Sequence, residues 1–377
     1  MLHDKTADMA KPNVAIVHYW FVSARGGEKV VEALLKAYPQ ADVYTHVFEA
    51  EKFPEIAARH RVFTSFISRI PGARRFYQKL LPLMPLALEQ LDLRGYDLVI
   101  SSESGPAKGV LTRPDALHVC YCHSPMRYLW DMYHDYRESA GRVTRWLMMP
   151  MGHYLRMWDR LSADRVDHFI ANSAFIASRI FKFYRREATV VHPPVDVERF
   201  NLVREKGDYF VLLGQLTAYK RPDLAVEAFR RMPEKRLLVV GDGEMVASLR
   251  KTAPANVSFL GRASDDVVTS TLEGARALIF PGVEDFGIVP VEAMACGTPV
   301  VAYGKGGVTE SVIDGVTGLY FYEQTAEALE AVLRDFDAWE PTIDRSILRS
   351  RADEFSHDAF RGRMSRLIEQ WVTSKTT

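Results

Sequence analysis

The stretch ALIFPGVEDFGIVPVEAMACGTPVVAYGKGG, from Ala277 to Gly307, predicts the fold. A short apolar run ends at Phe280, and a second one, VVAY, follows some twenty residues later. Between them, the residues from about Val289 to Cys296 have the composition of a short helix that stops at Gly297, and Pro290 suits its first turn. Strand, helix and strand in this order predict a parallel sheet with crossover helices.

The same alternation runs through the whole chain in two series. The first series contains six strand-like runs: Val14–Trp20, ADVYTHVF, Tyr96–Ser104, Leu117–Pro125, the start of RVDHFIANSAFIASRIFKFY, and ATVV. The second begins near Asp208 and contains YFVLLGQL, KRLLVVGDGE, NVSFLGRAS and GLYFY. A chain of 377 residues suits two domains. We therefore expect two doubly wound α/β domains, over residues 1–200 and 201–355, and a closing helix over 356–377 that packs toward the N-terminal domain.

Composition and charge exclude several classes of protein. Lys and Arg together number 48, as do Asp and Glu, so the sequence gives no indication of nonspecific nucleic-acid binding. Three cysteines, Cys120, Cys122 and Cys296, lack the spacing of a disulfide framework, and we expect small buried residues in a reducing compartment. The polar start has no signal-peptide core, and no apolar run is long enough to span a bilayer.

Two glutamates mark the candidate site. Glu284 lies in a glycine-containing loop after a strand, where ligands of open α/β sheets bind. Glu292 is expected in the first turn of the following helix, whose amides near Gly287–Val289 can bind a phosphate. A carboxylate repels phosphate, so Glu292 is better suited to accept hydrogen bonds from a sugar hydroxyl, such as those of a nucleotide ribose.

These residues resemble a known family. The pattern Glu284-x7-Glu292 with Phe286-Gly287 inside it resembles the retaining GT-B glycosyltransferases of family 4. Further similar segments are EAMACGTPVVA, Val239–Glu244, Phe259–Ser264, Gly306–Phe321 and Gly26–Leu34. The resemblance covers nearly the whole chain from about Val14. It implies two Rossmann-like domains facing a cleft, with a nucleotide-sugar held by the C-terminal domain and an acceptor by the N-terminal domain.

The resemblance also implies roles for individual residues on the donor side. Glu284 would contact the transferred sugar, Glu292 would bind the ribose, and the backbone of Phe286, Gly287, Ile288 and Val289 would approach sugar hydroxyls and the diphosphate. Lys220 matches the family's diphosphate-binding lysine. An arginine usually stands five residues earlier, where this chain has Gln215, so either Lys220 holds the leaving diphosphate alone or Arg221 or Arg262 compensates.

The N-terminal half supplies the remaining candidates. Gly26 and Gly27 stand between a strand and a helix, where their amides would meet the donor phosphate, although a tight turn explains the pair equally well. His123 matches the family's histidine near the donor sugar, and Glu284, His123 and Lys220 form the expected catalytic set. The segment HSPMRYLWD resembles bacterial O-antigen mannosyltransferases. Its members Arg127, Tyr128 and Trp130 are candidates for acceptor binding, with ordinary loop packing as the alternative.

The resemblance thus implies transfer of a sugar with retention, mannose from GDP-mannose being the first choice, onto a polyprenyl-diphosphate-linked saccharide. Neither a metal nor another cofactor is expected. Two alternatives remain: a nucleotide-sugar 2-epimerase of the same architecture, and a non-catalytic sugar-nucleotide-binding scaffold. A Rossmann dehydrogenase is disfavoured because SARGGEK, rather than G-x-G-x-x-G, follows the first strand.

Two further stretches, Arg69–Leu91 and Gly141–Leu161, mix basic residues with bulky apolar ones. Such a mixture suits the surface of an anionic membrane, while core helices with solvated basic faces are the alternative. Prolines in both are expected to break any long amphipathic helix. We expect a cytoplasmic protein associated with the inner face of the plasma membrane.

Overall fold

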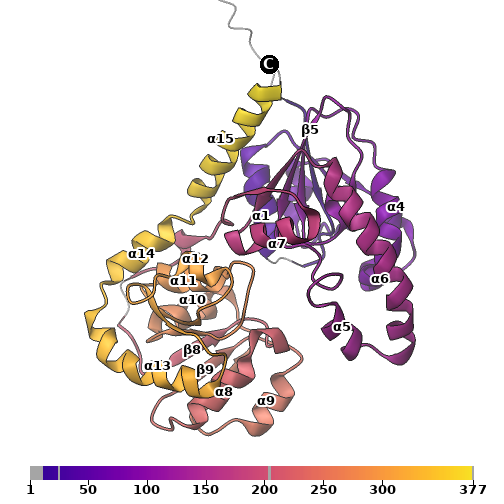
Figure 1. Ribbon diagram of the computed structural model, residues 1–377. Helices are drawn as coiled ribbons and strands as arrows, with labels where there is room; N and C mark the ends of the chain where they lie inside the picture. Colours follow the sequence, from indigo (N-terminus) through magenta and orange to yellow (C-terminus); the bar gives the residue numbers. More distant parts are fainter. Residues whose placement is uncertain (1–11, 24–25, 203–204, 376–377) are drawn as a thin grey trace, which may run out of the picture. The chain divides into compact units, whose positions relative to one another are not determined.

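The computed structural model describes residues 12–23, 26–202 and 205–375, which form two compact units (Figure 1). The first comprises the chain up to Asn172, then Ile176–Val190, and the residues from Met364 onward; the second comprises Ser173–Phe175 and Val191–Arg363. The main boundary between the two units therefore follows Val190, whereas the sequence analysis placed it after residue 200. The polar start of the chain, up to Lys11, lies outside the described residues.

The first unit contains a parallel sheet of seven strands in the order β3-β2-β1-β4-β5-β6-β7. Its strands are β1 (Val14–His18), β2 (Asp42–Thr45), β3 (Val62–Thr64), β4 (Leu98–Glu103), β5 (Leu117–Cys122), β6 (His168–Ala171) and β7 (Ala188–Val190). The chain order reverses between β1 and β4, as in a doubly wound fold. The sequence pattern had not predicted β3, a short edge strand of half-exposed residues.

The second unit contains a parallel sheet of six strands in the order β10-β9-β8-β11-β12-β13. Its strands are β8 (Phe210–Leu213), β9 (Leu237–Val240), β10 (Val257–Gly261), β11 (Leu278–Phe280), β12 (Val300–Tyr303) and β13 (Gly318–Phe321). Two Rossmann-like sheets confirm the predicted α/β class.

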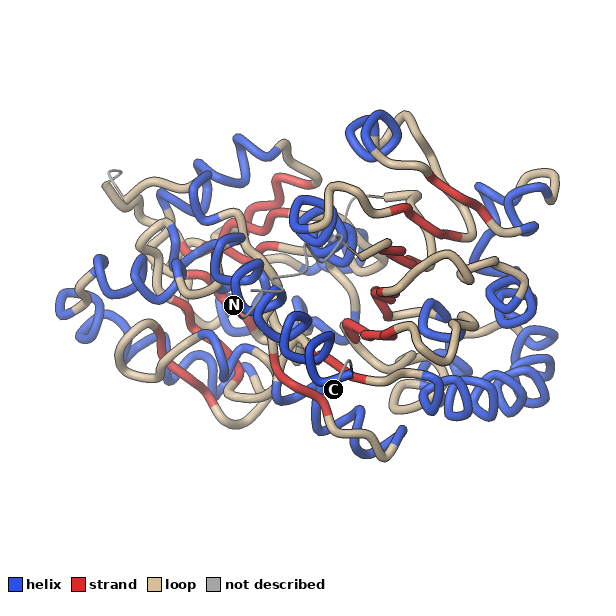
Figure 2. Tube along the Cα trace, turned by 90° about the horizontal axis from the view of Figure 1, so that it is seen from above, coloured by secondary structure: helices blue, strands red, loops and turns tan. Residues whose placement is uncertain are grey.

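Helices connect successive strands, and Figure 2 shows the strands of each sheet running among them. Those before the second sheet are α1 (Gly26–Ala37), α2 (Pro54–Arg59), α3 (Ala73–Phe76), α4 (Met84–Glu89), α5 (Tyr133–Ser139), α6 (Arg142–Ser162) and α7 (Ala174–Tyr184). Later ones are α8 (Pro222–Arg230), α9 (Val246–Thr252), α10 (Asp265–Gly274), α11 (Ile288–Ala295), α12 (Val308–Ser311), α13 (Ala326–Trp339), α14 (Arg345–Asp353) and α15 (His357–Lys375). The 3₁₀ turns are η1 (Phe66–Arg69), η2 (Tyr77–Leu83), η3 (Pro106–Gly109), η4 (Ala163–Arg165), η5 (Val197–Arg199), η6 (Ala218–Lys220) and η7 (Glu340–Thr342).

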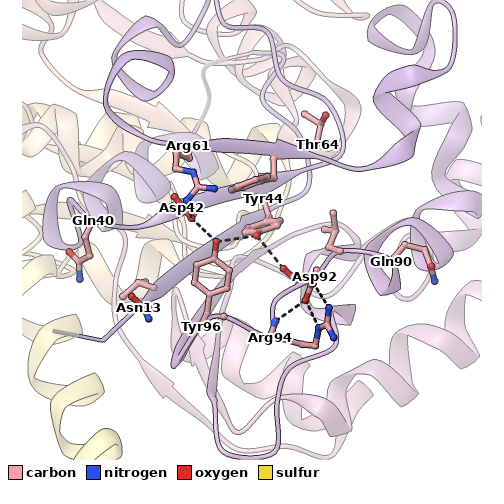
Figure 3. Close-up of a pocket in the computed structure, with 14 residues that line it drawn as sticks. Asn13, Gln40, Asp42, Tyr44, Arg61, Thr64, Gln90, Asp92, Arg94 and Tyr96 are labelled. Carbon is pink, nitrogen blue, oxygen red and sulfur yellow. Dashed lines mark hydrogen bonds and ion pairs between the residues drawn. The ribbon is translucent and has the colours of Figure 1, made fainter. Parts of the chain in front are cut away.

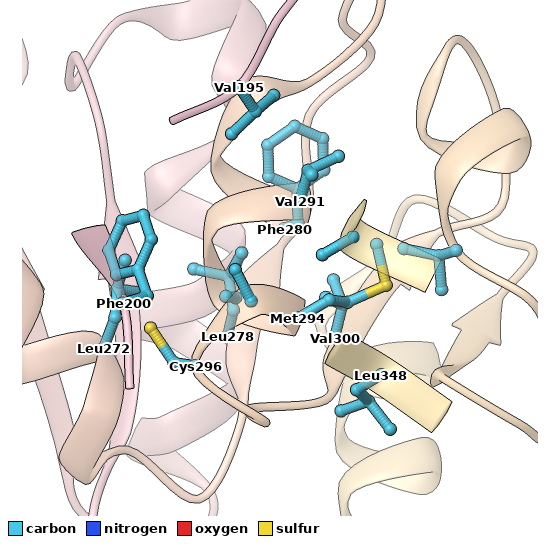
Figure 4. Packing of buried hydrophobic residues seen from close by; sticks show 14 of the residues in the cluster. Val195, Phe200, Leu272, Leu278, Phe280, Val291, Met294, Cys296, Val300 and Leu348 are labelled. Atoms are coloured by element: carbon cyan, nitrogen blue, oxygen red, sulfur yellow. The ribbon is translucent and has the colours of Figure 1, made fainter. Parts of the chain in front are cut away.

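Helix α11 lies in the core of the second unit. Val291 and Met294 are fully buried and belong to the same cluster as Phe280 at the end of β11 and Leu348 of α14 (Figure 4). A helix that is apolar on nearly every side has to be buried on nearly every side. Its burial fixes the loop that precedes it, which carries Glu284.

The two stretches that mix basic and apolar residues fold differently from each other. Residues 69–91 form short pieces, η1, α3, η2 and α4, as their prolines predicted. The expected break in the second stretch is wrong, because α6 is one helix of 21 residues with Pro150 inside it. Pro150 is exposed, so the missing hydrogen bond and the ring lie on the solvent side of the helix.

Candidate active site

In the second unit, the loops at the carboxyl ends of β8 and β11 are in close contact. A Cβ atom on Gly282 would lie 2.7 Å from the Cα of Lys220, so the β11 loop passes directly over the β8 loop. The β12 loop packs on the same segment, since a Cβ on Gly307 would lie 2.2 Å from the carbonyl oxygen of Asp285. The Gly307 amide also donates to the Glu284 carbonyl at 2.9 Å. Glycine is therefore required at both positions for the loops to approach.

These contacts bring two predicted site residues together. Lys220 Nζ lies 2.8 Å from Glu284 Oε1, and the two side chains are 20% and 21% exposed. They line one small cavity together with Gly214, Gln215 and the ends of β8 and β11. A cation and a carboxylate thus stand side by side at the edge of the sheet where ligands of this fold bind.

The N-terminus of α11 lies next to this pair along the chain. Gly287 precedes the helix with a φ of 88° and has no side chain of its own to cap the first amides. Phe286 is buried and packs its ring near His192 and Phe355. Because α11 begins at Ile288, Glu292 is its fifth residue and stands in the second turn, not in the first as expected. Its side chain is buried on the same helix that follows the Glu284 loop.

Position 215 holds Gln in place of an arginine, and the structure shows where the basic residues lie that could take over the role of this arginine. Gln215 itself is exposed. Arg221 donates to Asp223 at 3.1 Å, so part of its charge is already balanced. Arg262 follows β10, two strands away from β8 in the sheet order, and its side chain is exposed. Of the three cations weighed for the diphosphate, Lys220 is the one adjacent to Glu284.

In the first unit, His123 and Gly27 also come together. A Cβ on Gly27 would lie 3.7 Å from His123 Nε2 and 3.1 Å from the Tyr19 hydroxyl. Gly26 and Gly27 begin α1, whose start follows β1, while His123 follows β5. Burial, with a smaller effect of nearby His18, lowers the pKa of His123 to about 3. His123 is therefore a neutral imidazole at physiological pH, which can hydrogen-bond a sugar but carries no charge for the diphosphate.

The expected acceptor-binding residues have contacts within the first unit. The Trp130 indole donates to Asp159 Oδ2 at 2.7 Å and stacks on Phe183 at 4.9 Å. The Tyr128 hydroxyl lies 2.9 Å from the sulfur of Met126. These contacts give both aromatic residues a packing role, and acceptor binding by them and by the half-buried Arg127 stays a prediction.

Three polar residues that the sequence analysis did not assign form a series of contacts that ends at His123. Ser102 Oγ lies 2.8 Å from His123 Nε2 and 3.1 Å from His18 Nδ1. On its other side, His18 Nε2 lies 3.9 Å from Glu28 Oε1. A signal was present in the sequence, because His18 and Ser102 stand near the ends of strands in a parallel sheet, where ligands bind.

A second cavity, of about 1040 Å³, opens at the amino ends of β1, β2 and β4 (Figure 3). Its polar groups bond one another: Tyr96 donates to Asp42 Oδ2 at 2.6 Å, and Tyr44 donates to the Asp92 carbonyl at 3.2 Å. This cavity lies at the opposite edge of the sheet from His123. The three cysteines are buried and unpaired, as predicted.

Two family models match adjacent parts of the chain. A model described as "Glycosyltransferase Family 4" matches residues 24–199, and one described as "Glycosyl transferases group 1" matches residues 196–347. Together they cover every predicted site residue and all the strands of both sheets except β1.

Curated relatives with similar sequences include D-inositol 3-phosphate glycosyltransferases. The protein of Mycobacterium leprae is 29% identical over 200 residues, and that of Mycobacterium marinum is 30% identical over 200 residues. The alignments cover 45% of this chain and 47% or 43% of the relatives, so the chain matches less than half of their length.

Solved structures share the fold across nearly the whole chain. The Anabaena protein HepE, solved with UDP-glucose, has a TM-score of 0.68 at 17% identity over 95% of this chain and 99% of its own. Sucrose-phosphate synthase from Thermosynechococcus elongatus has a TM-score of 0.72 at 18% identity over 96% and 100%. WaaG, a glycosyltransferase of lipopolysaccharide biosynthesis, has a TM-score of 0.65 at 17% identity over 94% and 99%. With both family models and this fold, the chain belongs to the family 4 glycosyltransferases of GT-B fold.

Proposed function

We propose that the protein is a retaining hexosyltransferase that moves mannose from GDP-mannose onto a polyprenyl-diphosphate-linked saccharide in surface-polysaccharide synthesis. The observation that carries the proposal is the Lys220–Glu284 pair at the carboxyl ends of β8 and β11, next to the start of α11. Such an arrangement offers one cation and a set of backbone amides to a diphosphate, and a carboxylate to sugar hydroxyls.

The reaction breaks the bond between the sugar's anomeric carbon and the diphosphate oxygen, and it forms a bond from that carbon to an acceptor hydroxyl oxygen on the same face. The hydroxyl proton passes to the leaving diphosphate. Lys220 and the amides near Gly287 would stabilise the charge that develops on the diphosphate. Glu284 would hold the sugar, and Glu292 the ribose. We expect no metal requirement, so EDTA should leave the initial rate unchanged.

The identity of the donor is the finer part of the proposal. GDP-mannose follows from the resemblance of HSPMRYLWD to O-antigen mannosyltransferases, whereas HepE was solved with UDP-glucose, so UDP-sugars are the competing class. A nucleotide-release assay should compare GDP-mannose and UDP-glucose, each with and without polyprenyl-diphosphate-linked saccharides. Release of GDP that depends on the acceptor supports the proposal, and release of UDP instead would reassign the donor.

The two alternatives give different results in the same assay. An epimerase would convert the donor without any acceptor, and a scaffold would bind nucleotide without releasing it under any acceptor. Gln215 in place of an arginine favours the scaffold, because it removes one cation from the diphosphate site.

A lipid-linked acceptor requires access to a membrane surface, and α6 provides a surface for it. Among the described helices, none is long and apolar enough to cross a bilayer. Helix α6 nevertheless exposes apolar residues along one side, at spacings of three and four that align them on one face. These residues are Val143, Leu147, Pro150, Tyr154, Met157 and Leu161, with Trp146 beside them.

Charge favours an anionic lipid surface as the occupant of this face. From Ala140 to Trp158 the sequence contains Arg142, Arg145 and Arg156 but no acidic residue. A second copy of the chain would bring these arginines together without opposite charges beside the apolar stripe. Trp146, which is 72% exposed near the start of the helix, has the amphipathic ring typical of membrane interfaces. We therefore propose that α6 rests on the inner face of the plasma membrane.

A further inference from the structure

The loop that carries Glu284 is held by two segments that are distant from it in the sequence. The Ser173 hydroxyl donates to the carbonyl of Asp285, the next residue after Glu284, at 2.5 Å. The ring of Phe286 lies 5.3 Å from the ring of His192. Ser173 is 0% exposed, so its hydrogen bond is shielded from competing water. The conformation of the loop therefore depends on two residues, Ser173 and His192, to which the sequence analysis gave no role.

Glu310 joins these two segments through its carboxylate. Oε2 accepts the amide of Ala174 at 2.8 Å, and Oε1 accepts the amide of Phe175 at 3.1 Å. His192 Nε2 lies 3.1 Å from the same Oε2. Residues 173–175 belong to the second unit, as Glu310 and His192 do, so all these contacts lie within one compact unit. One carboxylate thus fixes both segments that reach the loop before α11.

A carboxylate is well suited to this position. Ala174 and Phe175 are the first two residues of α7, and the first amides of a helix have no acceptor within the helix. Burial acts to raise the pKa of Glu310, but hydrogen bonds from His192 and from these two amides hold it below its ordinary value. An ionised carboxylate can accept at both oxygens, whereas a glutamine can accept at one atom only.

The backbone of Glu310 is also fixed. Glu310 lies on α12, directly after the β12 loop, and Arg351 of α14 donates to its carbonyl at 2.6 Å. Arg351 also donates to the carbonyl of Ser311 at 3.0 Å. The carboxylate therefore extends from a helix that is bonded to the rest of the second unit, and it can serve as a fixed point for the residues that it contacts.

We propose that Ser173 and Glu310 are positioning residues for Glu284. Glu310 holds the two amides that follow Ser173, and the Ser173 hydroxyl in turn fixes the carbonyl of Asp285. The adjacent Glu284 side chain is thereby kept at its place 2.8 Å from Lys220. The proposal rests on the proposed function, in which Glu284 meets the transferred sugar.

The positioning should affect the sugar more than the nucleotide. Helix α11, whose first amides would hold the diphosphate, has core contacts of its own through Val291 and Met294, which are both 0% exposed. Loss of the Ser173 bond should therefore displace Glu284 more than it displaces these amides. We expect sugar transfer to be impaired while a nucleotide without a sugar still binds.

Two control variants remove similar groups elsewhere in the second unit. Ser311, like Ser173, is 0% exposed, and its hydroxyl donates to the carbonyl of Val308 at 3.3 Å. Glu273 is 5% exposed and accepts the amide of Asn201 at 3.0 Å. Ser311→Ala and Glu273→Gln therefore break a buried hydroxyl bond and neutralise a buried carboxylate in contacts that do not involve the loop before α11.

The first test separates transfer from nucleotide binding. In acceptor-dependent release of GDP from GDP-mannose, Ser173→Ala should lower kcat/KM about tenfold, the effect of one lost hydrogen bond, and Glu310→Gln at least as much. The Kd for GDP should change by less than about twofold in both variants, and both controls should match the wild type. An unchanged kcat/KM in Ser173→Ala, an equal loss in Ser311→Ala, or an equal loss of GDP affinity would overturn the proposal.

The second test needs no substrate. Hydrogen–deuterium exchange of peptides that cover residues 281–287 should be faster in Ser173→Ala and in Glu310→Gln than in the wild type, and unchanged in the two controls. If Glu310→Gln does not fold, Ser173→Ala alone decides, and unchanged exchange in it would overturn the proposal. If the wild-type protein releases nucleotide from no donor, the proposed function fails, while the exchange measurement still shows whether Ser173 and Glu310 hold the loop.

Discussion

Lys220 and Glu284 form an ion pair of 2.8 Å although they follow different strands, β8 and β11, and stand 64 residues apart in the sequence. Neither residue is needed to neutralise a buried charge, since both side chains are about one fifth exposed. The pair is instead placed where a ligand can reach it. Glu284 thus pairs with the lysine that the proposed reaction would use for the diphosphate.

Removing either member of this pair should abolish transfer and leave the fold intact. For Glu284→Gln and Lys220→Met we expect kcat/KM to fall at least about 100-fold, because each loses a charged contact made in the transition state. The melting temperature should barely change, since a solvent-accessible ion pair contributes about 1 kcal/mol or less. Acceptor-dependent nucleotide release and thermal unfolding provide the two measurements. Glu330→Gln, which removes an ion pair on α13, is the control and should keep full activity.

Restoring the missing cation should strengthen nucleotide binding. Gln215 lines the same cavity as Lys220 and Glu284, and its side chain is exposed, so Gln215→Arg can be accommodated. We expect the Kd for GDP to fall about tenfold, as for one added charge-assisted hydrogen bond, and to become more sensitive to salt. Calorimetric titration at two salt concentrations measures both effects. Unchanged affinity would mean that position 215 does not face the diphosphate.

The sequence indicated the candidate donor-site residues of the second unit because they lie in one short segment and after regular strand ends. Glu284 and Glu292 are eight positions apart, and this short spacing alone predicts that the loop with Glu284 leads directly into the helix with Glu292. The ion pair with Lys220 could not be read from spacing, since it depends on Gly282 and Gly307 allowing three loops to touch. In the first unit, Ser102 escaped notice because a serine in a strand usually has no chemical role, and its two histidine partners come from other strands.

The local sequence pattern is also a poor guide where a tertiary contact determines the structure. Pro150 was expected to end a helix, yet α6 continues because Leu155 and Trp158 are packed into the first unit and the proline faces solvent. Likewise, the sequence did not indicate that the Trp130 indole N–H donates to the buried carboxylate of Asp159. A buried acceptor of this kind cannot be located from sequence.

Buried neutral histidines should make the protein less stable in acid. Burial lowers the pKa of His46 to about 3 and that of His118 to about 4, and His123 has a pKa of about 3, against an ordinary value of 6.5. Below pH 6.5 the unfolded chain takes up protons that the folded chain does not, so the free energy of unfolding falls as the pH falls toward 4. At pH 5.5 the loss is about 1.4 kcal/mol per histidine.

Urea unfolding at pH 7.5 and 5.5 measures this loss. The variant His118→Gln removes one of these groups, so the difference in the free energy of unfolding between the two pH values should change by about 1.4 kcal/mol. A difference between the two pH values that His118→Gln leaves unchanged would show that His118 does not titrate as predicted.

The exposed face of α6 should bind anionic vesicles. Trp146 and Leu147 are 72% and 58% exposed, and both would insert their side chains below the lipid headgroups. We expect wild-type protein to sediment with vesicles that contain phosphatidylglycerol and not with vesicles of phosphatidylcholine alone, and the binding should weaken as salt is added. The double variant Trp146→Ser, Leu147→Ser should lower the partition coefficient at least about tenfold, because it removes two apolar side chains that no core contact requires.

Phe181→Ser, which removes an exposed ring from α7, is the control and should bind as the wild type does. If the double variant binds vesicles normally but sediments at half the mass of the wild type in analytical ultracentrifugation, the exposed face of α6 contacts a second copy of the chain and not a membrane.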